Sequence, residues 1–477
     1  MPATTAAGVG LANPADALAA ATRGGAFLFL GVPPGTAFTI DGVAFISGPS
    51  FQGLKMVPPG AHQVCYAARE AGSGAPGPVS SFWVWVDVAK AAPGRAGAPP
   101  PAQSIVVRRW NPATELLEPL GDDGEEAARY AAGVSRFDFD AGLAPYGLRG
   151  WAAWRELAGH IDAASLARLT PPGIPGGTVS VIAEADPGSG GGGEGRPRPP
   201  TPAEAALESA LAAGRARTGR SEAGDAGGGL AARAPGLLLG SPPYTRLPRL
   251  VGVCRPPGGP APAPAAAPVP SSTTSAAALT AANLDKTGTL TSIIAAPPFR
   301  GDRGAGLLAE FQHAFLTFWA GQSLAAYGAW KAALHLALGC VRGPRDPGTA
   351  PFFAALLTAL AAQLEASLGK GEGGGGGGGG DSRQPAPADG PFGLPMVDEL
   401  MADSFLRALV RRFLGRLRQE GEDADGTLPP VPQPVRAAAA GLAGVVQARL
   451  GWEVGGGEAE EEEEEDGPVV VDADGNY

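Results

Sequence analysis

The chain has 477 residues, of which 74 are glycine and 49 are proline, and its formal net charge is −11. This length allows about two or three domains, but this much glycine and proline is typical of ordered blocks joined by low-complexity spacers. Much of the negative charge is local and no strongly basic domain is present, which argues against strong direct nucleic-acid binding through phosphate contacts.

The N-terminal third is predicted to be β-rich. Residues 1–24 are expected to be disordered, and residues 25–175 to form a domain of short strands separated by Pro- and Gly-rich turns. Asp41-Gly42 is a strong tight-turn signal within one of the strand runs. The spacing of the runs is typical of a small sandwich or barrel. Strands are expected at 26–32, 36–46, 62–68, 80–88 and 104–110.

Helical patterns follow, and then a spacer. The last helix of this part begins after Asp162, a plausible N-cap. Residues 176–275 form a low-complexity linker, which cannot bury enough apolar area to offset its ordering entropy. The predicted helices lie at 122–133, 147–159 and 162–169, and within the linker at 202–216, with a further short segment at 241–250.

Residues 276–452 are predicted to be all-α, which makes the fold class α+β. Apolar residues recur there at three- and four-residue spacing, and the short link between the first two helices suggests an antiparallel pair. A Gly-rich insert at 369–390 is expected to be flexible. The most apolar window, 314–330, favours a buried core helix over a membrane span. The helices are expected at 307–321, 323–340, 352–368, 396–417 and 435–452.

Cysteine and histidine usage indicates neither a metal site nor a cofactor. The three cysteines are far apart and the four histidines do not cluster, so neither a disulfide framework nor a zinc site is expected. No P-loop, Rossmann or hydrolase fingerprint is present. We therefore expect a reducing compartment, the cytoplasm or the nucleus. The N-terminus lacks a secretory signal pattern, and a transit peptide is the alternative there.

One stretch carries a catalytic signature. Residues 285–291 read DKTGTLT, the phosphorylation signature of cation-pumping P-type ATPases, in which the Asp becomes a covalent phosphoenzyme. However, Asp285 follows an Ala-rich stretch that favours a helix over a hydrophobic strand. The paired-Asp loop that would hold magnesium, the nucleotide domain and the set of membrane spans have no counterpart in the sequence. Phosphoryl transfer by Asp285 is therefore the alternative, and no enzyme is expected.

A structural interpretation of the same stretch is simpler. Thr280, Asn283 and Asp285 can cap a helix that begins near this point. Leu290 and the Ile293-Ile294 pair would then enter the core. His62, within a predicted strand, is in the same way expected to be an ordinary or hydrogen-bonded histidine. The tryptophans follow strand or helix spacing and are expected in the core, namely Trp83, Trp85, Trp151, Trp154, Trp319 and Trp330.

The stretch 27–68 resembles the N-terminal signature of the A1-cistron splicing factor (Aar-two) family. In that signature a P-x-G-T-x-F-x-I-D segment precedes a G-P-x-F-x-G-x-K-M-[IV]-P-P-G-x-H segment. Further similarity lies in the L-x-P-Y segment at 143–146, in the LDKT segment that contains Asp285, and in the helix pair that contains Trp330. The matching signature residues include Pro34, Gly35, Thr36, Asp41, Gly53, Lys55, Met56, Pro58, Pro59, Gly60 and His62.

This resemblance implies a non-enzymatic assembly factor of the spliceosomal U-five snRNP. Family members bind the large scaffold protein Prp-eight at its RNase-H-like and MPN-type domains, together with other U-five snRNP proteins. They delay association of the RNA helicase, and they are found in the cytoplasm and nucleus. The implied fold is a β-rich N-terminal domain, a flexible linker and an α-helical C-terminal domain, with no membrane contact. A generic helical adaptor for another complex is the remaining alternative.

The C-terminal residues 453–477 are predicted to be an acidic tail that ends in a partner-binding strand. The acidic run occupies 458–466, and a solvated tail is the usual reading of such a run. Val469, Val470 and Val471 could add a strand to a sheet edge of the scaffold, and Trp452 is grouped with them as partner-binding. The alternative is an unattached tail. The SSTTS stretch at 271–275 is a candidate phosphorylation site for release.

Overall fold

The structure, a computed structural model, describes residues 24–69, 77–87, 104–120, 124–171, 174, 177–180, 242–248, 276–368, 405–418 and 428–453. Several predictions of the sequence analysis lie outside these residues. They are the disordered N-terminus, the helix at 202–216, the SSTTS stretch, the Gly-rich insert, the acidic run and the strand formed by Val469, Val470 and Val471.

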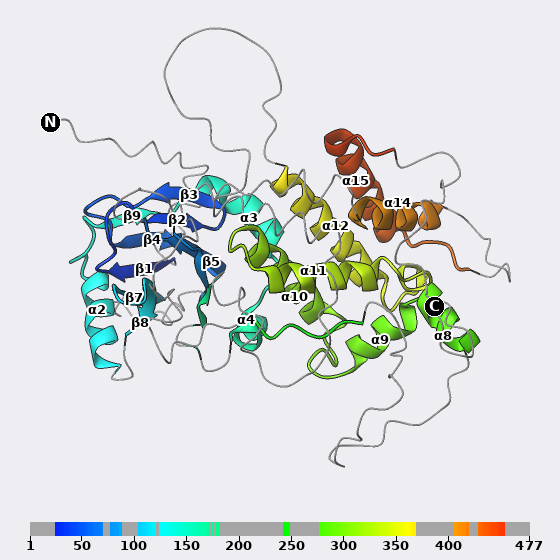
Figure 1. Cartoon of the computed structure of the whole chain (residues 1–477), viewed down its shortest axis with the longest axis horizontal. Coiled ribbons are helices and arrows are strands. Elements are labelled where there is room, and N and C mark those ends of the chain that lie inside the picture. Colours follow the sequence, from blue (N-terminus) through cyan, green and yellow to red (C-terminus); the bar gives the residue numbers. More distant parts are fainter. Residues whose placement is uncertain are drawn as a thin grey trace, which may run out of the picture.

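Two five-stranded sheets form the N-terminal domain (Figure 1). One has the strand order β8-β7-β1-β4-β9, in which β1 runs parallel to β7 and β4 parallel to β9. The other has the order β10-β6-β5-β2-β3 and is antiparallel throughout. The strands are β1 (Gly25–Leu30), β2 (Ala37–Ile40), β3 (Val43–Ile46), β4 (Gly53–Val57), β5 (Gly60–Ala67), β6 (Ser80–Val86), β7 (Ile105–Asn111), β8 (Leu116–Pro119), β9 (Leu143–Pro145) and β10 (Val179–Ser180).

A phenylalanine-rich core lies between the sheets. Phe27 and Phe29 of β1 share one buried cluster with Phe38 of β2 and Phe82 of β6, which belong to the opposite sheet. The rings of Phe29 and Phe38 stack with centroids 5.7 Å apart. In a β-sandwich, two sheets pack face to face and bury the side chains of their inner faces. The cluster contains side chains from both sheets, so the predicted sandwich is confirmed.

The predicted turn at Asp41-Gly42 joins β2 to β3. Asp41 has φ 52° and Gly42 has φ 78°, and a type I′ hairpin turn requires positive φ at both central residues. Ile40 pairs directly with Val43 across the turn. Four strands were not predicted, namely β4, β8, β9 and β10, because they are short and their residues lie among turn-forming Gly and Pro.

The described helices all lie after β8, with β9 between α2 and η1 and β10 after α4. Those next to the sheets are α2 (Glu125–Ser135), η1 (Leu148–Gly150), α3 (Trp151–Ala158) and α4 (Ala163–Leu169). The C-terminal domain has α8 (Ala276–Leu284), α9 (Thr287–Ala295), α10 (Ala305–Trp319), α11 (Leu324–Ala337), η3 (Gly343–Arg345), α12 (Ala350–Ser367), α14 (Phe405–Arg418) and α15 (Gln433–Leu450).

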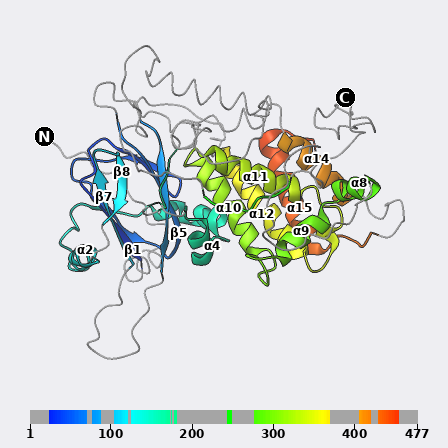
Figure 2. The same cartoon turned by 60° about the horizontal axis from the view of Figure 1, so that its bottom comes forward.

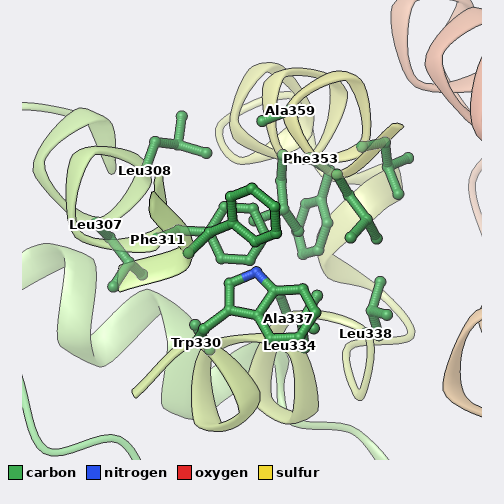
Figure 3. Packing of buried hydrophobic residues seen from close by; sticks show 14 of the residues in the cluster. Leu307, Leu308, Phe311, Trp330, Leu334, Ala337, Leu338, Phe353 and Ala359 are labelled. Atoms are coloured by element: carbon green, nitrogen blue, oxygen red, sulfur yellow. The ribbon is translucent and has the colours of Figure 1, made fainter. Parts of the chain in front are cut away.

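Large side chains from α10, α11 and α12 fill the centre of the C-terminal domain. Figure 3 shows Trp330 of α11 beneath Phe311 of α10 and Phe353 of α12. The rings of Phe311 and Trp330 are stacked with centroids 6.4 Å apart. The Trp330 Nε1 donates a hydrogen bond of 3.0 Å to Gln363 Oε1, so this buried indole keeps a polar partner.

The apolar window at 314–330 is not one core helix. It spans the end of α10 and the start of α11, and Gln322, with φ 59°, lies in the break between them. Ser323 begins α11 because its Oγ accepts a hydrogen bond from Ala326 N. Among the described helices, α12 alone is long and apolar enough to cross a membrane by length and composition, and 56% of its apolar window is buried inside the molecule.

The two domains share one core. Trp154 and Leu157 of α3 and Leu166 of α4 belong to the same buried cluster as Phe311 and Phe315 of α10. Figure 1 places α3 and α4 between the sheets and the C-terminal helices, and Figure 2 shows α4 in the same position. The helices that follow the sandwich in sequence therefore join it to the C-terminal domain.

Candidate functional site

The signature residues Asp41 and His62 form the centre of a buried polar cluster. Asp41 Oδ2 lies 2.5 Å from His62 Nδ1, and Asp41 Oδ1 accepts a hydrogen bond of 2.9 Å from Gln63 N. The other ring nitrogen of His62, Nε2, lies 2.7 Å from the carbonyl oxygen of Pro58. Both ring nitrogens of His62 therefore have a polar partner within hydrogen-bond distance. His62 is a fully satisfied histidine, as predicted.

Tyr146 completes this cluster from a distant part of the chain. Its hydroxyl donates a hydrogen bond of 2.6 Å to Asp41 Oδ2. Burial and the nearby charge of Asp41 raise the pKa of Tyr146 above its ordinary value. Burial, with a smaller effect of Asp41, also raises the pKa of Cys65. Both groups are therefore protonated at neutral pH, and the Asp41 carboxylate is enclosed by donors.

The first half of the signature shapes the loop that enters β2. Thr36 Oγ1 and Ser47 Oγ both donate hydrogen bonds to the Pro33 carbonyl, at 2.8 and 3.0 Å. Gly35, with φ 89°, donates its backbone N–H to Ser47 O. Pro34 is exposed at the tip of this loop. These residues close the open end of the β2–β3 hairpin.

The second half of the signature allows β1 and β4 to approach closely. Gly53 has φ 135°, and a Cβ built there would lie 1.9 Å from Phe27 O. Lys55 reaches across to Asp140 Oδ1 at 2.5 Å, and Met56 takes a positive φ of 64°. The remaining three residues form the turn into β5: Pro58 is buried, Pro59 is half-buried, and Gly60 has φ 135°.

Asp285 lies between two helices and has a structural role there. Its Oδ1 accepts hydrogen bonds from Thr287 N at 3.0 Å, from Thr287 Oγ1 and from Val341 N at 2.8 Å. Thr287 Oγ1 in turn accepts from Gly343 N. The carboxylate therefore fixes the start of α9 against the segment that follows α11. This arrangement supports the helix-start interpretation of the DKTGTLT stretch.

One detail of that interpretation was wrong. Thr280 and Asn283 lie inside a separate helix, α8, and so do not cap α9. Leu290 is fully buried in the core, and Ile293 and Ile294 are half-buried and pack against it. The Ala-rich stretch before Asp285 forms a separate helix, α8. The C-terminal domain therefore begins one helix before the DKTGTLT motif.

A second buried polar cluster lies at the seam between the domains. Glu310 of α10 forms an ion pair with Arg168 of α4, and its two carboxylate oxygens accept hydrogen bonds from Thr245 N and Oγ1. Tyr244 Oη lies 2.9 Å from Nδ1 of His313, one turn further along α10. Residues 242–248, which we call the strap, therefore bind to the same helix that contacts α4.

The seam extends to the sheet through His313 and its neighbours. Trp83 of β6 stacks on the His313 ring, with centroids 4.7 Å apart, and its Nε1 donates to Thr317 Oγ1. Burial lowers the pKa of His313 to about 3, and the positive charge of Arg168 acts in the same direction. His313 is therefore neutral in the folded chain. Gln312 links α10 to α3, since its Nε2 donates to Glu156 O and its Oε1 accepts from His160 N.

Sequence reasoning missed the seam as a site. Arg168 and Glu310 are 142 residues apart, and no local pattern connects them. One signal was available, because Glu310 is the only acidic residue of α10, a helix made mostly of apolar residues. A lone buried carboxylate needs a partner of opposite charge.

Trp330 and Trp452 both lie in the core of the C-terminal domain. Trp452 is 4% exposed and packs in the same cluster as Trp330. Its grouping with the partner-binding residues needs correction, because a side chain buried in this way holds the end of α15 in place and offers a partner no surface. Among the residues that the structure describes, no three His, Cys, Asp or Glu side chains gather where they could hold a metal ion.

Comparisons with known proteins match both domains to one family. The model of the AAR2 N-terminal domain matches residues 23–171, and that of the AAR2 C-terminal repeat region matches residues 264–455. The chain is similar to proteins named "Protein AAR2 homolog". The Caenorhabditis elegans protein is 30% identical over 150 residues, which are 31% of this chain and 36% of that relative. The Mus musculus and Homo sapiens proteins are 29% and 28% identical over 152 residues, 31% of this chain and 35% of each relative. The matched segment thus spans about a third of the relatives' own length.

Proposed function

Because the chain belongs to the AAR2 family, whose N-terminal and C-terminal models match its two domains, we propose that it is an assembly factor of the splicing machinery. The observation that carries the proposal is the match to both domains of one family. The shared core supports it, since a rigid pair of domains offers a partner one continuous surface. The carboxylates of Asp41, Glu310 and Asp285 each accept hydrogen bonds from other parts of the chain. They therefore stabilise the fold, which supports a role in binding a partner over a role in catalysis.

The proposed partner is the large spliceosomal scaffold protein Prp-eight, with other U-five snRNP proteins. Binding at its RNase-H-like and MPN-type domains would delay association of the RNA helicase. The chain would act as a chaperone-like subunit and not as an enzyme, in the cytoplasm and nucleus, without direct membrane contact or strong nucleic-acid binding. This partner follows from the sequence resemblance to the family.

Affinity purification of the full chain from its own cells tests this role. We expect the scaffold protein to co-purify in a pool that lacks the helicase, and mass spectrometry would identify both. A generic helical adaptor would instead bring down another complex. Recovery of the helicase in the same particle, at the same ratio to the scaffold, would contradict the proposed delay.

The proposed contact includes the tail residues Val469, Val470 and Val471. A short β-branched segment gains main-chain hydrogen bonds when it adds to the edge of a partner's sheet. Deleting residues 467–477 should therefore weaken the complex with the scaffold by about tenfold or more. A matched control replaces the three valines with threonine, which keeps the strand propensity and the backbone donors. An unchanged dissociation constant after the deletion would refute this contact.

A further inference from the structure

Strand β3 forms an open edge of the antiparallel sheet. It is the last strand in the order β10-β6-β5-β2-β3, so only one of its two sides is paired (Figure 1). Val43 and Ile46 are 44% and 51% exposed, and Ala44 between them is exposed as well. Among the described residues, the other exposed large hydrophobic side chains are Phe137 and Leu284. Half of these side chains therefore lie on one strand of four residues.

The other three sheet edges carry features that hinder further pairing. β8 ends in Glu118 and Pro119, β9 has three residues and ends in Pro145, and β10 has two residues. Proteins commonly block an open edge with very short strands, proline or charged side chains. β3 contains neither a proline nor a charged side chain, and no Asp, Glu, Lys or Arg lies between Asp41 and Lys55. The edge at β3 is therefore uncharged and open to pairing.

The hairpin turn determines which backbone groups of β3 face outward. Ile40 and Val43 flank the two-residue turn and bond to each other, and bonded positions then alternate along the strand. Val43 and Phe45 therefore bond to β2, while the N–H and C=O groups of Ala44 and Ile46 point away from the sheet. No hydrogen bond between described residues engages these four groups. They can pair with a further strand.

We propose that β3 pairs antiparallel with β3 of a second copy of this chain, around a two-fold axis at Phe45. In this register Ala44 lies opposite Ile46 of the partner subunit, and Ile46 lies opposite the partner's Ala44. Each of the two pairs exchanges two main-chain hydrogen bonds, so every outward backbone group of both strands is satisfied. The small Ala44 leaves room for the large Ile46 beside it on the outer face. The edge is therefore complementary to itself.

The charge distribution favours a second copy as the occupant of this edge. Each chain has a net charge of −11, which opposes association, but the uncharged edge brings no like charges together. A two-fold contact uses the same patch on both copies and closes after two chains. The strand supplies few residues compared with about 20–30 a side in a stable interface, so the dimer is weak. We expect a dissociation constant on the order of 10–100 μM. This inference does not depend on the proposed splicing role.

Sedimentation equilibrium of the full chain over a series of concentrations tests this pairing. The measurement is made at physiological ionic strength, where salt screens charge repulsion between the chains beyond about 8 Å. We expect a monomer–dimer equilibrium without larger species, because the two-fold contact leaves no second open β3 edge.

Two double variants test the register. Ala44→Glu with Ile46→Glu places like charges opposite each other in both pairs, and should weaken the dimer by about tenfold or more. Ala44→Lys with Ile46→Glu places opposite charges at the same positions, and should keep the dissociation constant within about threefold. The matched control, Phe137→Glu with Leu284→Glu, adds the same charge at exposed apolar positions elsewhere and should not change it. Circular dichroism confirms that each variant is folded.

Three results would overturn the proposal. The first is an unchanged chain that stays monomeric up to about 1 mM. The second is a dimer whose dissociation constant is the same in the two double variants, which would place the contact elsewhere or in another register. The third is a dimer that is lost when residues 454–477 are removed, which would make the tail of the other copy the occupant of the edge.

Discussion

At the scale of single residues, the signature positions are explained by backbone geometry and by buried hydrogen bonds. Gly53 lies where a side chain would collide with β1, and Gly60 takes a φ that other residues rarely adopt. Asp41 is hydrogen-bonded to two neighbouring residues of β5, His62 and Gln63, and to Tyr146. These residues make packing and hydrogen-bond contacts inside the sandwich, which gives a structural reason for the dense signature.

Gly53→Ala should destabilise the chain by about 3 kcal/mol or more, because the new methyl group meets the Phe27 carbonyl and the φ is unfavourable. Gly48→Ala is the matched control, since a Cβ there meets no atom within 4 Å. Its effect should stay within about 0.5 kcal/mol. Urea unfolding measures both, and equal midpoints for the two variants would contradict the explanation.

The stability of the chain should fall as pH decreases through the range below 6.5, owing to His313. Its pKa is about 3 in the folded chain and 6.5 in the unfolded chain, so the unfolded chain binds more protons between these values. The resulting slope approaches about 1.4 kcal/mol per pH unit.

Unfolding free energies between pH 5 and 6.5, above the usual range of carboxylates, measure this effect. Burial also lowers the pKa of His160, so the comparison is with His313→Gln, which keeps the contribution of His160. We expect a smaller slope in the variant. The same slope in both proteins would show that His313 is not the source.

At the scale of elements, distant segments are joined through single carboxylates. Asp285 connects the start of α9 to the segment after α11, and Glu310 connects α10 to α4 and to the strap. Each carboxylate satisfies several donors at once, which aligns helices that share no local sequence pattern. The strap lies within the predicted linker 176–275, so the linker range contains a segment with defined contacts, and β10 also lies within it.

Glu310→Gln should loosen the strap. The amide keeps one acceptor oxygen and loses the charge that pairs with Arg168, so one bond from Thr245 and the ion pair are lost together. Hydrogen exchange at the Thr245 amide should rise about tenfold, and stability should fall by about 1–3 kcal/mol.

The exposed Glu365→Gln on α12 is the control, with the same change of charge. Mass spectrometry of the exchanged peptides reports both variants. Unchanged protection of residues 242–248 in Glu310→Gln would mean that Glu310 does not hold the strap.

At the scale of the whole molecule, the sandwich and the C-terminal helices form one structural unit. The central cluster contains side chains from β5, α3 and α4 as well as from α10, α11 and α12. Trp154 lies within it, 2% exposed, and its Nε1 donates to Ala61 O on β5. Independent unfolding of either domain would expose this cluster to water, so the two should unfold together.

Trp154→Ala should lower the unfolding free energy by about 3–5 kcal/mol and leave a single transition. Calorimetry gives the number of transitions, and the half-buried Trp85→Ala serves as control, with a smaller shift. Two separate transitions in the unchanged chain would show that the domains are independent.

Patterns between residues close in the chain were sufficient to predict most strands and helices, the α+β class, the Asp41-Gly42 turn and the family. Alternation and helical spacing depend on near neighbours, so they are visible in one dimension. Strands of two to five residues among Gly and Pro, such as β4 and β10, were missed because they are too short for a period.

The partners of buried charges could not be predicted in this way. Asp41 meets Tyr146 across 105 residues, and Glu310 meets Arg168 across 142. These contacts exist because packing brings distant segments together and then requires each buried charge to find a partner. The same packing buried Trp452, which the sequence had grouped with a binding surface. Composition and periodicity thus determined the elements and their family, while three-dimensional packing determined which side chains meet and which are left for a partner.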